Sequence, residues 1–253
     1  MQFYINGEKK VVVVDDYFPY NEAKGKWAFS RPSESNEIWV LILEKAWAKV
    51  FGSYSRIEAG DCGEVMNPLT GCPTQNITLA EYKNKSNLWH LLSWADRLQF
   101  PMCCAASSSK EDFVGQQEIE EKGIVDNHAY TLIGVQEIKM DNGKTENLLC
   151  VRNPWGKTKK MTEWKGDWSD VSPLWTAKTK QQVGFKEAND GIFWISLKDF
   201  DLFFYLVTIC YYREDYDDST LCDQHELDSF GMYKFTYSPS EASKNTPITF
   251  TLN

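Results

Sequence analysis

The stretch A-Y-T-L-I-G-V-Q-E-I-K-M-D-N-G-K-T-E-N-L-L-C-V, residues 129–151, decides the fold of this chain. Two runs typical of β-strands, residues 129–138 and 147–151, flank M-D-N-G-K at residues 140–144. Asn-Gly between two such runs is a strong local hairpin signal. The stretch therefore predicts an antiparallel β-hairpin.

Two polar residues stand at the open end of this hairpin. His128 precedes the first strand run and Asn153 follows the second. Opposed residues of an antiparallel pair have Cβ atoms roughly 4.5–5.5 Å apart, so we expect the Asn153 amide oxygen to accept a hydrogen bond from the His128 ring. An imidazole held in this way has a fixed tautomer, which a thiol nucleophile requires of its base. By itself, a strand-end histidine is more often structural, and Asn153 also suits the start of a turn.

A nucleophile for this base is harder to find. Papain-like enzymes place the nucleophilic cysteine roughly 130–150 residues before the histidine, and only 127 residues precede His128. We therefore expect the nucleophile at or beyond the N-terminus. Cys62, in G-D-C-G, lies at about half the required spacing. No apolar helix is expected after Cys62, whereas a helix N-terminus is what lowers the pKa of a nucleophilic thiol.

The composition bounds the class of protein. The chain has 253 residues, of which 42% are hydrophobic, enough for one large domain or two smaller ones. Its net charge of −9 argues against a nucleic-acid partner. The apolar stretch at residues 202–212 is far shorter than the roughly 20 residues of a membrane span. No secretory signal is evident and the seven cysteines are odd in number, so we expect reduced thiols in the cytoplasm.

Further elements are expected around the hairpin. Apolar residues at helical spacing predict a helix from Glu37 that stops at Gly52, and another over residues 88–98. Residues 60–73, rich in Gly, Pro and Asn, predict a loop and a subdomain boundary. Strands are predicted over residues 101–106, 193–195 and 205–212, with a short helix starting near residues 196–199.

Several motifs in the same order give the chain a family resemblance. They are N-H-A-Y-T at 127–131, R-N-P-W-G at 152–156, E-W-K-G-D-W-S-D at 163–170, D-G-I-F-W-I-S-L-K-D-F at 190–200, V-V-V-D-D at 12–16 and L-E-K-A-W-A-K at 43–49. With these motifs the chain resembles the calpains, calcium-dependent papain-like cysteine endopeptidases, over about residues 1–212.

The resemblance implies an α+β fold, a papain-like protease core of the calpain type that is truncated at its N-terminal side. Residues 1–72 are expected to form the back half of the first protease subdomain. Residues 73–212 are expected to form the second subdomain, an antiparallel β-sheet with a few helices. Residues 213–253 resemble a linker and the opening strands of the β-sandwich that follows the core in this family.

The resemblance also assigns roles at the hairpin. His128 matches the catalytic base and Asn153 the residue that orients it. Trp155 is expected to shield their hydrogen bond from water, which strengthens it, although plain core packing is the alternative. The residue before the histidine is Asn127, where calpains usually have Gly, and its side chain is expected to crowd the groove.

A calcium site is implied as well. Glu163, Asp170 and Asp190 match carboxylate ligands of the family, and Ala188 matches a carbonyl ligand. Ile192 stands where the family has Glu, and losing one hard oxygen ligand weakens such a site. The alternative is that these acids are ordinary surface charges.

Two functions are compatible with these expectations. The first is a calcium-dependent cysteine endopeptidase that acts on protein or peptide substrates. This chain would supply the His/Asn half of its site and lack the nucleophile, so the isolated chain is expected to be inactive until the missing catalytic half or a larger assembly completes it. The second is a non-catalytic pseudoprotease, a calpain-like scaffold or regulatory module.

Overall fold

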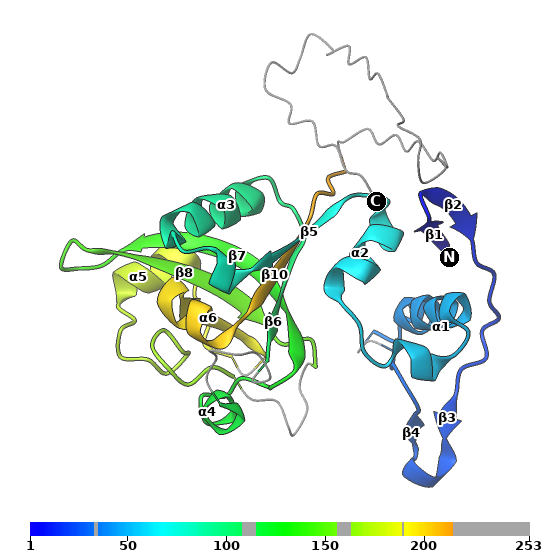
Figure 1. Cartoon of the computed structure of the whole chain (residues 1–253). Helices are drawn as coiled ribbons and strands as arrows, with labels where there is room; N and C mark the ends of the chain where they lie inside the picture. Colours follow the sequence, from blue (N-terminus) through cyan, green and yellow to red (C-terminus); the bar gives the residue numbers. More distant parts are fainter. Residues whose placement is uncertain (33–34, 108–114, 156–162, 189, 215–253) are drawn as a thin grey trace, which may run out of the picture. The chain divides into compact units, whose positions relative to one another are not determined.

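The computed structural model describes residues 1–32, 35–107, 115–155, 163–188 and 190–214 (Figure 1). The chain divides into two compact units with a boundary between Pro73 and Thr74. Each unit is described by itself below. The expected linker and β-sandwich strands of residues 213–253 lie almost entirely outside the described residues.

The first unit combines short strands with helices. Its elements are β1 (Gln2–Ile5), β2 (Glu8–Val11), β3 (Tyr20–Asn21), η1 (Glu22–Lys24), β4 (Lys26–Trp27), α1 (Trp39–Phe51), η2 (Tyr54–Ile57) and α2 (Cys62–Thr70). Strands β1 and β2 form a hairpin whose Asn6-Gly7 turn has positive φ at both residues. The buried apolar residues of this unit are few: Phe3, Leu41, Ala46, Ala48 and Cys72.

Residues 60–73 correct the loop prediction, because most of them form helix α2. The Asp61 carboxylate caps this helix and accepts a hydrogen bond from the backbone N–H of Gly63 at 2.7 Å. Gly71 ends it in the left-handed conformation, with φ of 75° and its N–H bonded to the Asn67 carbonyl. Asp61 and Gly71 are residue types typical of helix ends, but the Gly, Pro and Asn content of the stretch favoured the loop prediction.

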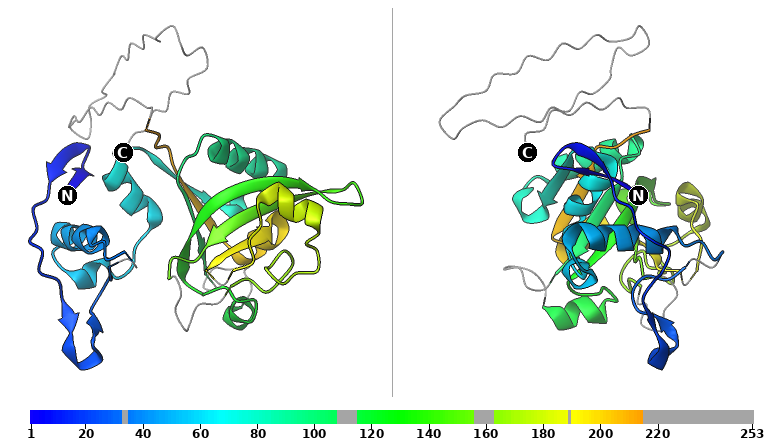
Figure 2. Two further views of the ribbon diagram at one scale, coloured as in Figure 1. Left: turned by 180° about the vertical axis from the view of Figure 1, so that it is seen from behind. Right: turned by 90° about the vertical axis from the view of Figure 1, so that its right-hand side faces the viewer.

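The second unit is built on one antiparallel sheet. Its strands are β5 (Thr74–Thr78), β6 (Met102–Ala106), β7 (His128–Lys139), β8 (Thr145–Arg152), β9 (Ile192–Ser196) and β10 (Leu206–Cys210), in the order β5-β10-β6-β7-β8-β9. Figure 1 labels five of these strands, β5, β6, β7, β8 and β10, and Figure 2 shows the same unit from two further sides. The other elements are η3 (Leu79–Glu81), α3 (Lys85–Arg97), α4 (Gln116–Glu121), α5 (Ala177–Val183) and α6 (Leu197–Phe203).

The predicted hairpin is the pair β7 and β8. Its register runs from Lys139 opposite Thr145 to Thr131 opposite Arg152, and a β-bulge interrupts it between Leu132 and Gly134. A bulge adds one residue to one strand and changes which face the following side chains occupy. The sequence periodicity did not reveal this irregularity.

Both faces of the sheet carry apolar layers. Successive side chains of a strand point to opposite faces, and on β8 Leu149 packs in the large core while Leu148 packs in a second, smaller one. The large core includes apolar residues of α3 and α6. The smaller core holds Trp168 and Trp175 together with Val183 of α5. The sheet is therefore covered on both faces around the hairpin.

Helix α3 starts earlier than the sequence predicted. It begins at Lys85 because the Asn84 side chain accepts from the Ser86 N–H at 3.0 Å and so caps the helix. Helix α1 starts at Trp39, two residues later than expected, with no side-chain cap.

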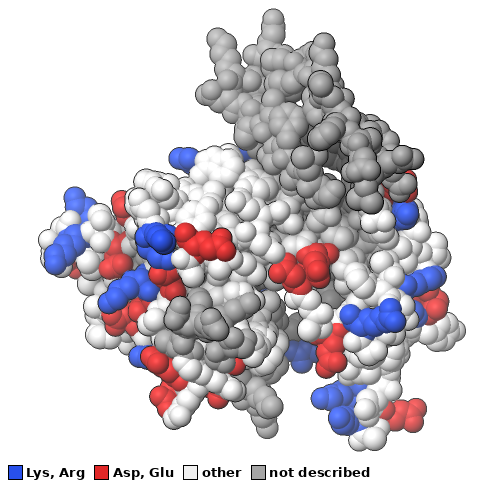
Figure 3. All heavy atoms as spheres, viewed as in Figure 1, with Lys and Arg blue, Asp and Glu red and all other residues white. Residues whose placement is uncertain are grey.

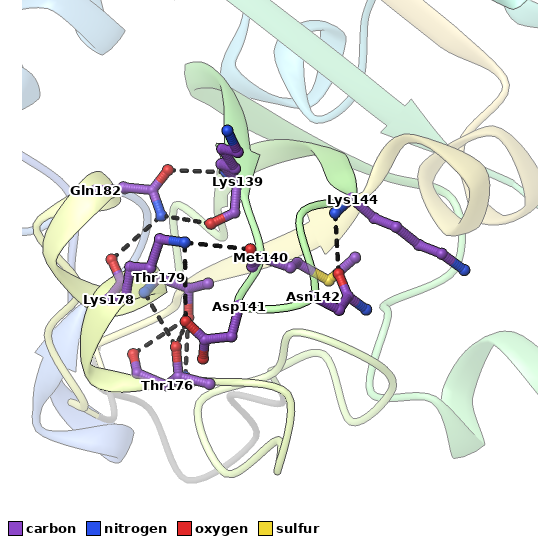
Figure 4. A network of polar contacts seen from close by, with 9 residues as sticks. All are labelled: Lys139, Met140, Asp141, Asn142, Lys144, Thr176, Lys178, Thr179 and Gln182. Carbon is purple, nitrogen blue, oxygen red and sulfur yellow. Dashed lines mark hydrogen bonds and ion pairs between the residues drawn. The ribbon is translucent and has the colours of Figure 1, made fainter.

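The far end of the hairpin is tied to helix α5 (Figure 4). The Gln182 side chain accepts from the Lys139 N–H at 2.8 Å and donates to the Lys139 carbonyl at 3.1 Å. Lys178 Nζ donates to the Met140 carbonyl at 3.2 Å and lies 3.9 Å from the Asp141 carboxylate. These contacts hold the turn against α5 and so fix the two strands whose other end carries His128 and Asn153.

Candidate functional site

The hairpin brings His128 and Asn153 into contact. His128 is the first residue of β7, and Asn153 follows β8. The His128 Nε2 atom lies 3.0 Å from Asn153 Oδ1. The two residues are diagonal rather than directly opposed as expected, because the last pair of the register is Thr131 with Arg152. Long side chains bridge such a diagonal readily.

The Asn153 side chain is held in one orientation. The residue is fully buried, and its backbone N–H donates to the Gly191 carbonyl at 2.8 Å. Its Oδ1 atom also accepts from the backbone N–H of Trp155 at 3.1 Å. A group that accepts from a backbone N–H is the amide oxygen, so His128 Nε2 must be the donor in the other contact. This assigns the Nε2–H tautomer and leaves Nδ1 as the basic nitrogen of a neutral ring.

Two aromatic rings surround the imidazole. The Trp155 ring lies 4.4 Å from the His128 ring between centroids, and the Tyr130 ring meets it edge-on at 4.9 Å. Trp155 is 43% exposed, so it covers the histidine from the solvent side and does not belong to the core. Burial lowers the pKa of His128, and the hydrogen bond to Asn153 offsets part of that effect.

The residue before the histidine is tied back by its own side chain. Asn127 has φ of 49°, the left-handed region that Asn tolerates better than most residues. Its Oδ1 accepts from the Ser107 hydroxyl at 2.7 Å, and its Nδ2 lies 3.2 Å from the Asp126 carboxylate. Ser107 is buried, directly after β6, and sequence reasoning missed it. The one signal available was its place next to a predicted strand.

The structure places Cys62 at the N-terminal end of a helix, whereas the sequence predicted a loop there. It is the first residue of α2, so a helix does follow this cysteine, although Gly63 is its only buried residue and it is not the apolar helix whose absence was predicted. The Asp61 cap, not an apolar periodicity, starts this helix. Cys62 belongs to the first unit, whereas His128 and Asn153 belong to the second.

The acids proposed as calcium ligands are each engaged by backbone N–H groups. Glu163 accepts from Gly191 at 2.7 Å, Asp170 from Ala188 at 3.1 Å and Asp190 from Ile192 at 3.0 Å. Burial, followed by the charges of neighbouring acids, raises the pKa of Glu163 and of Asp170 despite these bonds. The acids are thus close enough to repel one another.

These acids do not form a metal site as they stand. Within the described residues, no group of three or more His, Cys, Asp or Glu side chains is placed to hold a metal ion. Ala188 engages Asp170 through its N–H. Ile192 supplies no side-chain oxygen at the position where the calpains have Glu. The residues therefore do not fit a preformed calcium site.

Two further features concern the charged surface and the lengths of the helices. On the face seen in Figure 3, basic and acidic side chains are interspersed and neither forms a large continuous area. In the part of the chain that the structure describes, no helix combines the length and apolarity needed to cross a membrane.

The fold and the site together define a class of protein. A histidine oriented by a buried asparagine is the arrangement that papain-like cysteine proteases use. The family model described as "Calpain family cysteine protease" matches residues 1–211. The chain belongs to this family, and its helices with a six-stranded antiparallel sheet agree with the α+β papain-like core predicted from the sequence.

Individual relatives support the same assignment. Calpain-14 of Homo sapiens is 38% identical over 210 residues, which cover 82% of this chain and 28% of that protein. The calpain-type cysteine protease DEK1 of Zea mays is 36% identical, covering 83% of this chain and 9% of the relative. A calpain of Schistosoma mansoni is 32% identical, covering 83% and 27%. The chain thus spans less than a third of the length of these relatives.

Proposed function

We propose that this chain supplies the histidine and asparagine of a calpain-like cysteine endopeptidase site. The observation that carries the proposal is the 3.0 Å contact between His128 Nε2 and Asn153 Oδ1, with the amide oxygen oriented by the Trp155 N–H. This geometry leaves His128 Nδ1 as a base of defined direction. Membership of the calpain family adds the reaction class, hydrolysis of peptide bonds.

The proposed chemistry follows from that base. His128 Nδ1 takes the proton of a cysteine thiol, and the thiolate sulfur attacks the carbonyl carbon of the peptide bond. The imidazolium then returns the proton to the leaving amine as the C–N bond breaks. Water hydrolyses the resulting thioester with His128 as base. Asn153 keeps the ring in place throughout, since it accepts from Nε2–H in both charge states.

The thiol in this scheme belongs to a cysteine other than Cys62. Spacing supports this part of the proposal, because a papain-like nucleophile lies roughly 130–150 residues before its histidine. Cys62 is at the N-terminus of a helix, but its distance along the sequence from His128 is about half of that. The isolated chain is then expected to show no peptidase turnover.

The test compares the 253-residue chain with the full-length protein, each carrying His128→Ala or Cys62→Ala. Peptide turnover and labelling by a thiol-directed active-site probe are measured, with the exposed His90 on α3 changed to Ala as the matched control. We expect turnover only in the full-length protein, its loss in His128→Ala, and its retention in Cys62→Ala and His90→Ala.

Other results would redirect the proposal. Turnover by the 253-residue chain that is lost in both the His128 and Cys62 variants would identify Cys62 as the nucleophile. A full-length protein without turnover or probe labelling would favour the non-catalytic scaffold. The sequence that precedes this chain separates the same two alternatives: a Gly-Asp-Cys-Trp segment, which carries the nucleophile in this family, would favour the enzyme, and a substituted cysteine there would favour the scaffold.

We further propose that the first unit packs against another polypeptide, the missing catalytic half or a larger assembly. Several large apolar side chains support this: Val13, Tyr17 and Trp39 are 72%, 82% and 57% exposed. The 253-residue chain is expected to bind a hydrophobic dye or to self-associate. A monodisperse monomer that does not bind the dye would contradict the proposal that the first unit packs against another polypeptide.

Calcium remains a separate proposal. Glu163, Asp170 and Asp190 each accept one backbone N–H and keep further acceptor positions, and we expect calcium binding there to be weak because Ile192 replaces a carboxylate. Isothermal titration with CaCl₂, comparing the chain with Ile192→Glu, tests this. Tighter binding in the variant is expected; equal binding in both would remove these positions from consideration.

A cytoplasmic location is proposed on the odd number of cysteines, seven in the chain.

A further inference from the structure

A pocket opens directly beside the candidate catalytic histidine. It has a volume of about 600 Å³, within the usual range for ligand sites of roughly 300–1,000 Å³. Trp155 and Asn127 line it, and these are the residues that cover and precede His128. All of its described lining belongs to the second unit. A peptide bound at His128 would therefore present a neighbouring side chain to this pocket.

The described lining of this pocket combines acidic and apolar side chains. Glu120 of α4 and Asp126 supply two carboxylates, and none of the described lining residues is basic. Ile124, Val125 and the Trp155 ring supply the apolar surface. A lysine or arginine side chain matches this combination, because its aliphatic stem packs on apolar surface while its charged head stays near polar groups and water.

The carboxylates are held by local contacts. Glu120 Oε1 accepts from the Gln116 side-chain amide at 2.9 Å, one turn earlier on the same helix. Asp126 accepts from the backbone N–H of Asn127 at 2.9 Å and lies 3.2 Å from its Nδ2. A carboxylate has about four acceptor positions, so both can accept further hydrogen bonds from a cation.

We propose that this pocket is a subsite that selects a lysine or arginine side chain of the substrate next to the bond to be cut, with Glu120 as the specificity-determining residue. The inference rests on the proposed function, since it assumes that a peptide lies along His128. It goes further by naming the side chain that the neighbouring pocket accepts. Trp155 then has two roles: it covers the imidazole on one side and forms a wall of the subsite.

The test measures peptide binding and peptide cleavage separately. The peptides are fluorescein-labelled octapeptides in which each position in turn carries Lys, Gln or Glu. Their affinity for the 253-residue chain with His128→Ala is measured by fluorescence anisotropy. Cleavage of the same peptides is measured with the full-length protein. A partly exposed ion pair contributes about 0.2–1 kcal/mol, which corresponds to up to about fivefold in affinity. We expect the Lys peptide to bind about two- to fivefold more tightly than the Gln peptide at one position.

Helix α4 provides a matched control. Glu121 accepts from Gln117 at 2.9 Å in the same geometry as Glu120 from Gln116, but it does not line the pocket. Glu120→Gln is expected to abolish the preference for Lys, and Glu120→Lys to reverse it in favour of Glu. Glu121→Gln removes the same charge and is expected to change nothing.

The outcomes separate this inference from the proposed function. A binding preference without cleavage by the full-length protein would support the subsite and overturn the peptidase activity. Cleavage without any preference among Lys, Gln and Glu would overturn the subsite alone. Equal effects of the Glu120 and Glu121 variants, or no binding of any octapeptide, would also overturn the subsite.

Discussion

Replacing Asn153 tests the central contact of the site, because this residue controls both the orientation and the pKa of His128. In Asn153→Ala the imidazole loses its acceptor, and the charged form of the ring loses a stabilising hydrogen bond. Since that bond raises the pKa of His128 against the effect of burial, the variant is expected to have a lower His128 pKa than the parent chain. Asn153→Asp places a carboxylate in the same position and is expected to raise the pKa above that of the parent.

The cost in stability follows from the same contacts. Asn153 Oδ1 accepts from both His128 Nε2 and the Trp155 N–H, and leaving a buried donor unsatisfied costs about 1–3 kcal/mol. The half-buried histidine can recover a partner from water. The substitution also removes the Nδ2 atom, a buried amide with no partner among the described residues, which offsets part of the loss. A net loss of about 2 kcal/mol is expected, or about 4–8 °C in Tm for a chain of this size.

The dependence on pH has a definite sign. Burial holds the pKa of His128 in the folded state below the ordinary value of a histidine, so the unfolded chain binds the proton more readily. The contribution of His128 to the free energy of unfolding is therefore complete at pH values above its unfolded-state pKa. It is lost as the pH falls through that pKa. This loss is expected to be steeper in Asn153→Ala and shallower in Asn153→Asp.

The assay is an NMR titration of the imidazole Cε1–H signals, together with thermal unfolding at several pH values. The chain contains three histidines, and His128→Ala identifies the relevant signal. A His128 pKa that stays the same in both variants would refute the reasoning, because it would mean that Asn153 does not bond the ring in solution. A shift in the same direction in both variants would refute the assignment of the amide oxygen as the acceptor.

Three further substitutions probe the surroundings of the site. Gly123→Ala is expected to cost about 2–3 kcal/mol by urea unfolding, because φ is 82° and the new Cβ would meet the Glu163 carbonyl oxygen at 1.9 Å. Gly143→Ala, with φ of 83° and open space, is the control and should cost about 1 kcal/mol; equal costs would exclude the clash. Glu163→Gln is expected to raise Tm at pH 7 but not near pH 4, because the raised pKa shows that the ionised carboxylate is disfavoured in the fold; a lower Tm at pH 7 would contradict this. Ser196→Ala removes the N-cap of α6 and should cost about 1 kcal/mol; an unchanged unfolding midpoint would show that the cap contributes nothing.

The hairpin and its polar end were predictable because their causes are local. The Asn-Gly pair specifies the turn, and the flanking runs specify strands, so the two ends of the hairpin must meet whatever surrounds them. His128 and Asn153 were therefore placed at one end of the sheet from the sequence, and the structure brings them within hydrogen-bonding distance. The order of the motifs was equally informative about the family.

Helix α2 was missed because two local signals compete in residues 60–73. Gly, Pro and Asn favour loops, whereas Asp61, whose carboxylate accepts from the Gly63 N–H, favours a helix start. Pro68 and Gly71 belong to the stretch predicted as a loop, but in the structure the proline lies within the helix and the glycine ends it. Only the hydrogen bonds that actually form decide between these signals.

The sequence by itself determined the hairpin, the identity of the candidate base and its orienting amide, and the calpain family. Tertiary structure alone decided the bulge in β7, the contact between Ser107 and Asn127, and the pocket beside Trp155. The physical reason is the range of the interactions. Turn and strand preferences act over a few neighbouring residues, whereas these three features depend on packing and hydrogen bonds between segments that the chain brings together only when it folds.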